Sequence, residues 1–166
     1  MGVDPGMRLT GFGCVETPRR GTTLPLTRSR DAALVDAGVI RLDVDLPIAD
    51  RLVQLEREFV ALLDELKPEL VGIESLYAHV EHPATSIVMG HGRGVLLLAT
   101  RRAGISLVEL KATEIKKSLT GFGHAGKGQM QGAIKYEFSL AVEPKPADVA
   151  DGLAIALAAL RRRELA

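Results

Sequence analysis

The chain has 166 residues, of which 46% are apolar and 25% charged, and its basic and acidic side chains are equal in number. This is the composition of a globular protein with a sizeable core, and a net charge of zero argues against a broadly basic nucleic-acid binder. Cys14 is the only cysteine, which excludes an intrachain disulfide and a paired-cysteine metal site. No apolar run reaches the roughly 18 residues that span a bilayer, and no basic segment precedes an apolar one at the N-terminus, so we expect a cytoplasmic protein.

The first part of the chain predicts three strands that pair as antiparallel neighbours. Val3 and Asp4 belong to a first strand that is unusually short for the centre of a sheet. Residues 9–15 and 34–42 predict the second and third strands. Between them, residues 17–31 are rich in Thr, Pro, Arg and Gly and predict a long loop.

From Ile48 the apolar residues recur at spacings of three and four, which predicts an amphipathic helix. Pro47 suits the first turn of this helix, and Pro68 ends it. Further along we predict, in order, a buried strand at 70–73, a helix at 84–103, a strand at 105–110, helices at 112–119 and 128–140, and a helix at 148–162.

This order of elements predicts an α/β fold. Three antiparallel strands followed by two strands with helical crossovers make a mixed five-stranded sheet flanked by helices. The sequence contains no internal repeat and no linker, so we expect residues 1–166 to form a single domain.

Four acids in three separated apolar segments are the strongest functional signal in the sequence. They are Asp4 before a Pro-Gly turn, Glu74 after the strand at 70–73, and Asp148 and Asp151 at the start of the last helix. A carboxylate in apolar surroundings is costly to bury, and a divalent cation such as Mg²⁺ offsets that cost because it takes oxygen ligands. Four carboxylates brought to one place suit two-metal phosphodiester hydrolysis.

Each of these acids also has a purely structural explanation. Asp4 can cap the N–H groups of its turn, and Glu74 can pair with a nearby arginine. Asp148 and Asp151 share one helix face, but the helix dipole favours acids in a first turn without any metal.

Positive charge is gathered in the last part of the chain. Residues 1–100 carry 10 basic and 14 acidic side chains, whereas residues 101–166 carry 11 and 7. Between 111 and 135 one acid, Glu114, stands among five lysines, which are Lys111, Lys116, Lys117, Lys127 and Lys135. The cluster is either a solvated helical face or a phosphate-binding surface that offsets the repulsion between four acids and a polyanion.

One aromatic residue and the histidines complete the set of candidate site residues. Tyr77 follows Glu74 closely, and it either packs on the core or stacks on an unpaired base. The four histidines have no shared metal-ligand spacing and are interpreted as loop or surface residues; they are His79, His82, His91 and His124.

Four motifs follow one another along nearly the whole chain. They are Asp4-Pro5-Gly6 with Thr10-Gly11-Phe12-Gly13, Gly72-Ile73-Glu74, Gly90-His91-Gly92-Arg93-Gly94-Val95, and Asp148-Val149-Ala150-Asp151-Gly152-Leu153-Ala154-Ile155. In this order and spacing they resemble the RuvC family of Holliday junction resolvases. The resemblance implies a ribonuclease H-like fold and a homodimer that cuts four-way DNA junctions symmetrically in recombination and repair, leaving 5′-phosphate ends. It also implies the RuvA–RuvB branch-migration complex as a partner.

The resemblance further implies a metal and a set of site residues. The family uses two Mg²⁺ ions per subunit, for which Mn²⁺ can substitute. Its four acids, as metal ligands and catalytic groups, match Asp4, Glu74, Asp148 and Asp151. Tyr77 matches an aromatic that probes the junction centre, and Lys116 and Lys127 match two lysines near the DNA. Arg93, in the third motif, is a further expected DNA contact.

The chain departs from the family pattern away from the four acids. The first strand lacks several residues that the family places before its glycine, and the loop at 17–31 is longer than usual. His91 and Gly92 replace the usual Gln-Ala, and His82-Pro83 alters the segment before them. These differences bear on substrate preference and on the dimer contact.

Three alternatives remain open from the sequence. A ribonuclease of the same fold would cut an RNA-containing duplex. Asp4 with Gly6, Gly11 and Gly13 resembles the first phosphate loop of actin-like ATPases, which need a second lobe and a longer chain. A non-catalytic junction-binding module would not need four intact acids.

Overall fold

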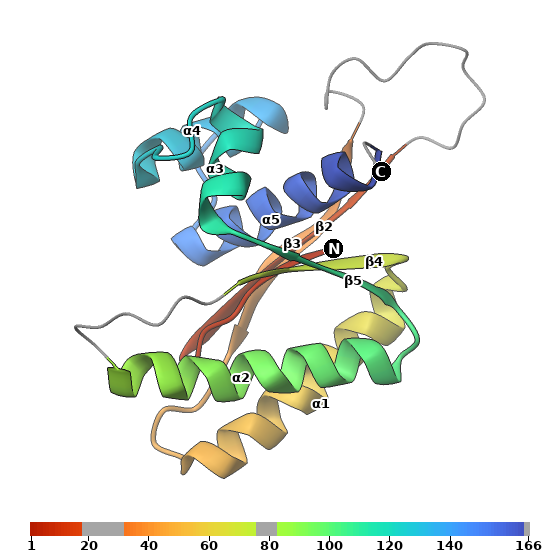
Figure 1. Ribbon diagram of the computed structural model, residues 1–166, viewed down its shortest axis with the longest axis vertical. Helices are drawn as coiled ribbons and strands as arrows, with labels where there is room; N and C mark the ends of the chain where they lie inside the picture. The colour runs from red at the N-terminus through yellow and green to blue at the C-terminus, as the bar shows by residue number, and fades with distance from the viewer. Residues whose placement is uncertain (18–31, 76–82, 165–166) are drawn as a thin grey trace.

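The computed structural model describes residues 1–17, 32–75 and 83–164, and its centre is a five-stranded sheet (Figure 1). The strands are β1 (Gly2–Asp4), β2 (Leu9–Glu16), β3 (Ala33–Arg41), β4 (Leu70–Glu74) and β5 (Ser106–Leu110), in the spatial order β3-β2-β1-β4-β5. β2 pairs antiparallel with both β1 and β3, whereas β4 runs parallel to both β1 and β5. The mixed five-stranded sheet expected from the sequence is confirmed.

Helices cover both faces of this sheet (Figure 1). Within the described residues they are α1 (Ile48–Leu66), α2 (Pro83–Arg102), α3 (Ala112–Thr120), α4 (Lys127–Glu137) and α5 (Ala147–Glu164). α1 and α2 lie together on one face; α5 lies on the other face, with α3 and α4 packed outside it. None of the helices in these described ranges is long and apolar enough to cross a membrane.

The bounds of α1 follow directly from its sequence. Pro47 precedes the first turn, and Leu55, Phe59 and Leu63 form the buried stripe that faces the sheet. Lys67 ends the helix in the left-handed conformation with φ of 45°, and its N–H donates to the Leu63 carbonyl. The predicted helix is confirmed at both ends.

β1 is short and central, as the sequence predicts. Its three residues lie between β2 and β4, where Val3 is fully buried and pairs with Phe12 on one side and Ile73 on the other. The main chain of β1 is therefore fixed from both sides, even though the strand is only three residues long.

Glycines bring α5 unusually close to the sheet. A Cβ added to Gly11 would lie 1.9 Å from the Asp148 carbonyl oxygen, and one added to Gly13 would lie 2.6 Å from the Leu153 side chain. Gly11 and Gly13 thus lie inside β2 and pack against α5, so they are not available as a phosphate loop. The glycine pattern that resembles actin-like ATPases has a packing explanation instead.

Two predicted segments differ from the structure or lie outside it. α4 ends at Glu137 rather than at 140, because Ser139 adopts a φ of 51° and cannot continue the helix. The predicted loop at 17–31 lies outside the described residues, apart from its first residue.

Candidate active site

Strand pairing brings the first two acids to the same edge of the sheet. Asp4 is the last residue of β1, Glu74 is the last residue of β4, and the two strands run parallel with Val3 opposite Ile73. Asp4 and Glu74 are therefore neighbours at the carboxyl ends of adjacent strands. This juxtaposition is a consequence of topology and register, not of sequence distance.

The alternation of side chains along each strand sets the direction of these acids. Val3 and Ile73 are fully buried in the core on the α1–α2 face. Gly2 and Gly72, one residue earlier, pack against α5. Asp4 and Glu74 share the parity of those glycines, so their carboxylates belong to the α5 face.

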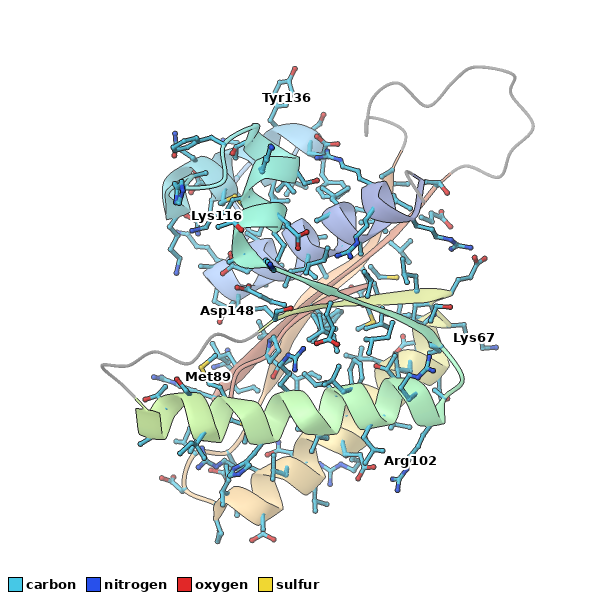
Figure 2. All side chains as sticks on the ribbon, in the orientation of Figure 1. Lys67, Met89, Arg102, Lys116, Tyr136 and Asp148 are labelled. Atoms are coloured by element: carbon cyan, nitrogen blue, oxygen red, sulfur yellow. The ribbon has the colours of Figure 1, made fainter. Side chains whose placement is uncertain are left out.

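The second pair of acids arrives on α5 itself. This helix begins at Ala147, so Asp148 lies in its first turn (Figure 2). Asp151 lies one turn further along the same face of the helix. The close approach at Gly11 fixes the backbone of Asp148 against β2. The structure thus gathers acids from the beginning, middle and end of the chain at one end of the sheet.

The electrostatics show that the four carboxylates share one environment. Burial raises the pKa of Asp4 to about 7, and repulsion from Asp151, Glu74 and Asp148 adds to the effect. Burial is also the main cause that raises the pKa of Glu74 and of Asp151, and repulsion between carboxylates contributes to both. Such a group of acids is costly unless protons or cations compensate its charge.

Two lysines partly compensate the negative charge. Lys116 lowers the pKa of Glu74 and of Asp151, and Lys127 lowers the pKa of Asp4 and of Asp151. Lys116 lies on α3 (Figure 2), and Lys127 begins α4. The structure therefore places both predicted lysines beside the acids, where they also extend positive charge outward from the site.

Buried side chains hold the lysine-bearing helices on α5. Ile115 of α3, Met130 and Ile134 of α4, and Ala125 between the two helices belong to the same core as α5. Arg161 of α5 donates to the Ser118 carbonyl and pairs with a carboxylate of α4. Lys116 and Lys127 are consequently fixed relative to the acids at the level of their backbones.

The donor set fits a hard divalent cation in its chemistry. Four carboxylates converge, and none makes a hydrogen bond or ion pair with another group of the described residues. As they stand, no three His, Cys, Asp or Glu side chains of the described chain form a complete cage for one metal ion.

Arg93 already has two partners within the protein. Its side chain is only 16% exposed, its Nε donates to the Glu74 carbonyl over 3.0 Å, and its Nη2 pairs with Glu109. The expected DNA contact of Arg93 stays a prediction. The two partners of Arg93 lie 16 and 19 residues away in the chain, and no local pattern in the sequence indicates them.

Tyr77 lies outside the described residues, as do His79 and His82. The remaining two histidines, His91 and His124, are exposed, in agreement with the surface role expected from the sequence.

Two arginines beside the acids were missed by the sequence analysis. Arg8 and Arg51 line a pocket that includes Asp148 and the first turns of α2. Arg51 is held in place by a 3.1 Å hydrogen bond from its Nη1 to the Met7 carbonyl. Arg8 sits in a turn and Arg51 on a helix with mixed charges, so only the folded chain reveals that they line one pocket with Asp148.

The fold and the acids together define a class of protein: a nuclease-type α/β domain with carboxylates at the ends of two central strands and on the last helix. The family model described as "Crossover junction endodeoxyribonuclease RuvC" matches residues 1–159. The chain belongs to this family. Its activity is therefore that of a DNA endonuclease that resolves Holliday junctions, and its fold is ribonuclease H-like.

Individual relatives agree with this assignment. The crossover junction endodeoxyribonuclease RuvC of Synechococcus sp. (strain WH7803) is 34% identical over 157 residues, which cover 95% of this chain and 94% of the relative. The structure of Thermus thermophilus RuvC is 26% identical, with a TM-score of 0.83 over 99% of this chain and 94% of that one. A second structure, T. thermophilus RuvC in complex with a Holliday junction substrate, is 22% identical, has a TM-score of 0.80, and covers 99% and 93%.

Proposed function

We propose that this chain resolves four-way DNA junctions by paired, metal-dependent cuts, one from each subunit of a homodimer. The observation that carries the proposal is the group of four carboxylates whose burial and mutual repulsion raise the pKa of Asp4 to about 7. A four-way junction has two equivalent strands to cut, and a two-fold dimer supplies two equivalent sites. Membership of the RuvC family supports this substrate.

In this proposal two Mg²⁺ ions per subunit, or Mn²⁺ in their place, are held by Asp4, Glu74, Asp148 and Asp151. When bound, the ions would activate a water for in-line attack at phosphorus and stabilise the leaving 3′ oxygen, which gives 5′-phosphate ends. The protein's part is to hold the carboxylates on rigid elements.

Lys116 and Lys127 would hold the phosphates on either side of the cut. Their interaction with the acids supports this role, because a lysine near the carboxylates also lies near any phosphate bound there. Arg8 and Arg51 offer further positive charge in the pocket that includes Asp148. Tyr77, three residues after Glu74, is proposed to stack on a base at the junction centre.

Other expectations stay proposals. They are a single domain over residues 1–166, a cytoplasmic location, and a RuvA–RuvB branch-migration complex as partner.

The decisive experiment uses a labelled four-way junction and a linear duplex of the same arm sequence, each with and without Mg²⁺ or Mn²⁺. We expect paired nicks in the junction only when metal is present, and no cutting of the linear duplex. Equal cutting of both substrates would contradict junction selectivity. Preferential cutting of an RNA-containing duplex would favour the ribonuclease alternative, and junction binding without cutting at any metal concentration would favour a binding module.

A further inference from the structure

Arg93 connects three elements around the end of β4. It projects from α2, its Nε donates to the Glu74 carbonyl over 3.0 Å, and its Nη2 pairs with the Glu109 carboxylate on β5. Its side chain is 16% exposed, whereas that of Glu109 is 50% exposed. The Arg93 guanidinium therefore bridges the backbone of β4 and a side chain of β5 from the α2 side of the sheet.

The hydrogen bond from Arg93 to the Glu74 carbonyl acts on the peptide group that directly follows the Glu74 side chain. Glu74 is the last residue of β4, and the next residue, Ser75, makes one more hydrogen bond to the Leu110 carbonyl, over 2.8 Å. The peptide group between Glu74 and Ser75 is therefore held at both ends, its N–H by the Leu110 carbonyl and its carbonyl by Arg93. A hydrogen bond to its carbonyl fixes the peptide plane, and with it the direction in which the Glu74 side chain leaves the backbone.

The partners of Arg93 are themselves anchored. Arg162 of α5 donates to the Glu109 carbonyl over 3.0 Å, so Glu109 is held from both faces of the sheet. Gly92, adjacent to Arg93, packs against Met7 so closely that an added Cβ would lie 2.5 Å from the sulfur. Met7 follows Asp4 by three residues in the β1–β2 turn, so one short segment of α2 contacts both acid-bearing strand ends.

We infer that Arg93 is a positioning residue that orients Glu74 for cation binding and makes no contact with DNA. The inference rests on the proposed role of Glu74 as a metal ligand. An arginine suits the task because its planar fork can serve two acceptors at once, whereas a lysine is a single point charge. Loss of such an outer contact typically weakens metal affinity or activity by about 10–100-fold.

The test compares Arg93→Ala and Arg93→Lys with Arg102→Ala. Arg102 lies in the last turn of the same helix, is 68% exposed, and pairs with Glu56 over 3.3 Å, so it is a matched control. Three quantities are measured: Mn²⁺ bound by the protein alone, followed by the Mn²⁺ EPR signal; junction affinity without divalent metal at several salt concentrations; and cleavage as a function of Mg²⁺ concentration.

We expect Arg93→Ala to weaken Mn²⁺ binding at least tenfold and to raise the Mg²⁺ requirement for cleavage by a similar factor. Junction affinity and its salt dependence should not change, and Arg93→Lys should show a partial defect in the same direction. Arg102→Ala should match the wild type in all three measurements. If Arg93→Ala does not fold, Glu109→Gln removes the ion pair while leaving the Glu74 hydrogen bond, and should give a smaller defect of the same kind.

Two results would overturn the inference. One is weaker junction binding with a salt slope reduced by about one and an unchanged metal requirement, which is the behaviour of a phosphate contact. The other is a lowered melting temperature with normal Mn²⁺ binding by the folded fraction, which is a purely structural role. Glu74→Gln separates this inference from the proposed function: if that variant binds Mn²⁺ like the wild type, Glu74 is not a ligand and the proposed site itself fails.

Discussion

The two faces of the sheet are packed in different ways. On the α1–α2 face the core is filled by large side chains, among them the fully buried Leu55, Phe59 and Leu96. The α5 face also has an apolar core, with Leu153, Ile155 and Leu157, but there strand glycines additionally bring the helix to backbone distance: a Cβ added to Gly2 would lie 2.1 Å from the Ala156 nitrogen. The α1–α2 face is thus joined mainly through side chains, whereas the α5 face is joined through side chains and close backbone contacts.

The difference follows the distribution of the acids. Asp148 and Asp151 are carried by α5, and Asp4 and Glu74 lie on the strand face that α5 covers. A helix packed at backbone distance cannot slide without a clash, so the carboxylates keep a fixed spacing. The opposite face has its own core, and through Arg93 it also supplies the hydrogen bond that holds the end of β4.

The largest difference between the two faces is expected when one carboxylate is removed from each, Asp151 from α5 and Asp64 from α1. Asp151→Asn keeps the size of the side chain but loses the charge that holds a cation, so cleavage should fall at least about 10³-fold. Junction binding should persist or tighten, because a negative charge near DNA is lost. Gel-shift and cleavage assays measure the two effects.

Asp64→Asn is the matched control, since Asp64 is an exposed acid of α1 on the opposite face. It should cut and bind like the wild type. Retained cleavage by pure Asp151→Asn protein would remove the α5 acids from the chemistry.

The second prediction concerns pH. Asp4 has a pKa of about 7 in the folded protein, against an ordinary value of 3.8, so between these pH values the folded state holds more protons than the unfolded chain. The free energy of unfolding of the metal-free protein should therefore fall as the pH rises from about 4 to 7, by up to roughly 4 kcal/mol. Urea denaturation at several pH values measures this.

Asp4→Asn should flatten the decline and should leave the metal-free protein more stable than the wild type at pH 8. Mg²⁺ should stabilise the wild type most at high pH, where the carboxylates are ionised. If the free energy of unfolding of the metal-free wild type instead rose steadily from about pH 4 to 7, the clustered carboxylates would not destabilise the folded protein.

Much of the fold and of the candidate site can be predicted from the sequence, because local patterns define most of the helices and strands. α1 was predicted at both ends because Pro47 and Pro68 flank an apolar stripe of regular spacing. The four acids stand out because each interrupts an apolar segment. The sequence does not show that Gly11 meets the Asp148 backbone, or that Arg93 bridges Glu74 and Glu109, since these contacts depend on tertiary register.

The third prediction tests the rigidity of the α5 contact directly. Gly11→Ala places a methyl group 1.9 Å from the Asp148 carbonyl oxygen, which no rotamer can relieve. We expect a loss of about 1–3 kcal/mol of stability, and about a 100-fold loss of cleavage because α5 must shift. Urea denaturation and single-turnover cleavage provide the two measurements.

Gly94→Ala is the contrast on the other face, because nothing lies within 4 Å of the added Cβ in α2. It should stabilise the helix by up to about 1 kcal/mol and leave cleavage unaltered. If Gly11→Ala were as well tolerated as Gly94→Ala, the α5 face would be no more constrained than the α1–α2 face.

The smallest expected effects belong to the lysines that α3 and α4 hold over the acids. Lys116→Ala and Lys127→Ala each remove one charge that faces the carboxylates, and in the proposal one phosphate contact. Each should weaken junction binding several-fold and lower the slope of log affinity against log salt by about one.

Lys117→Ala is a control of the same type, because Lys117 is exposed on α3 and is not among the lysines that interact with the three perturbed acids. It should leave the salt slope closer to that of the wild type. An unchanged salt slope for both variants would mean that Lys116 and Lys127 serve only to balance the charge of the acids.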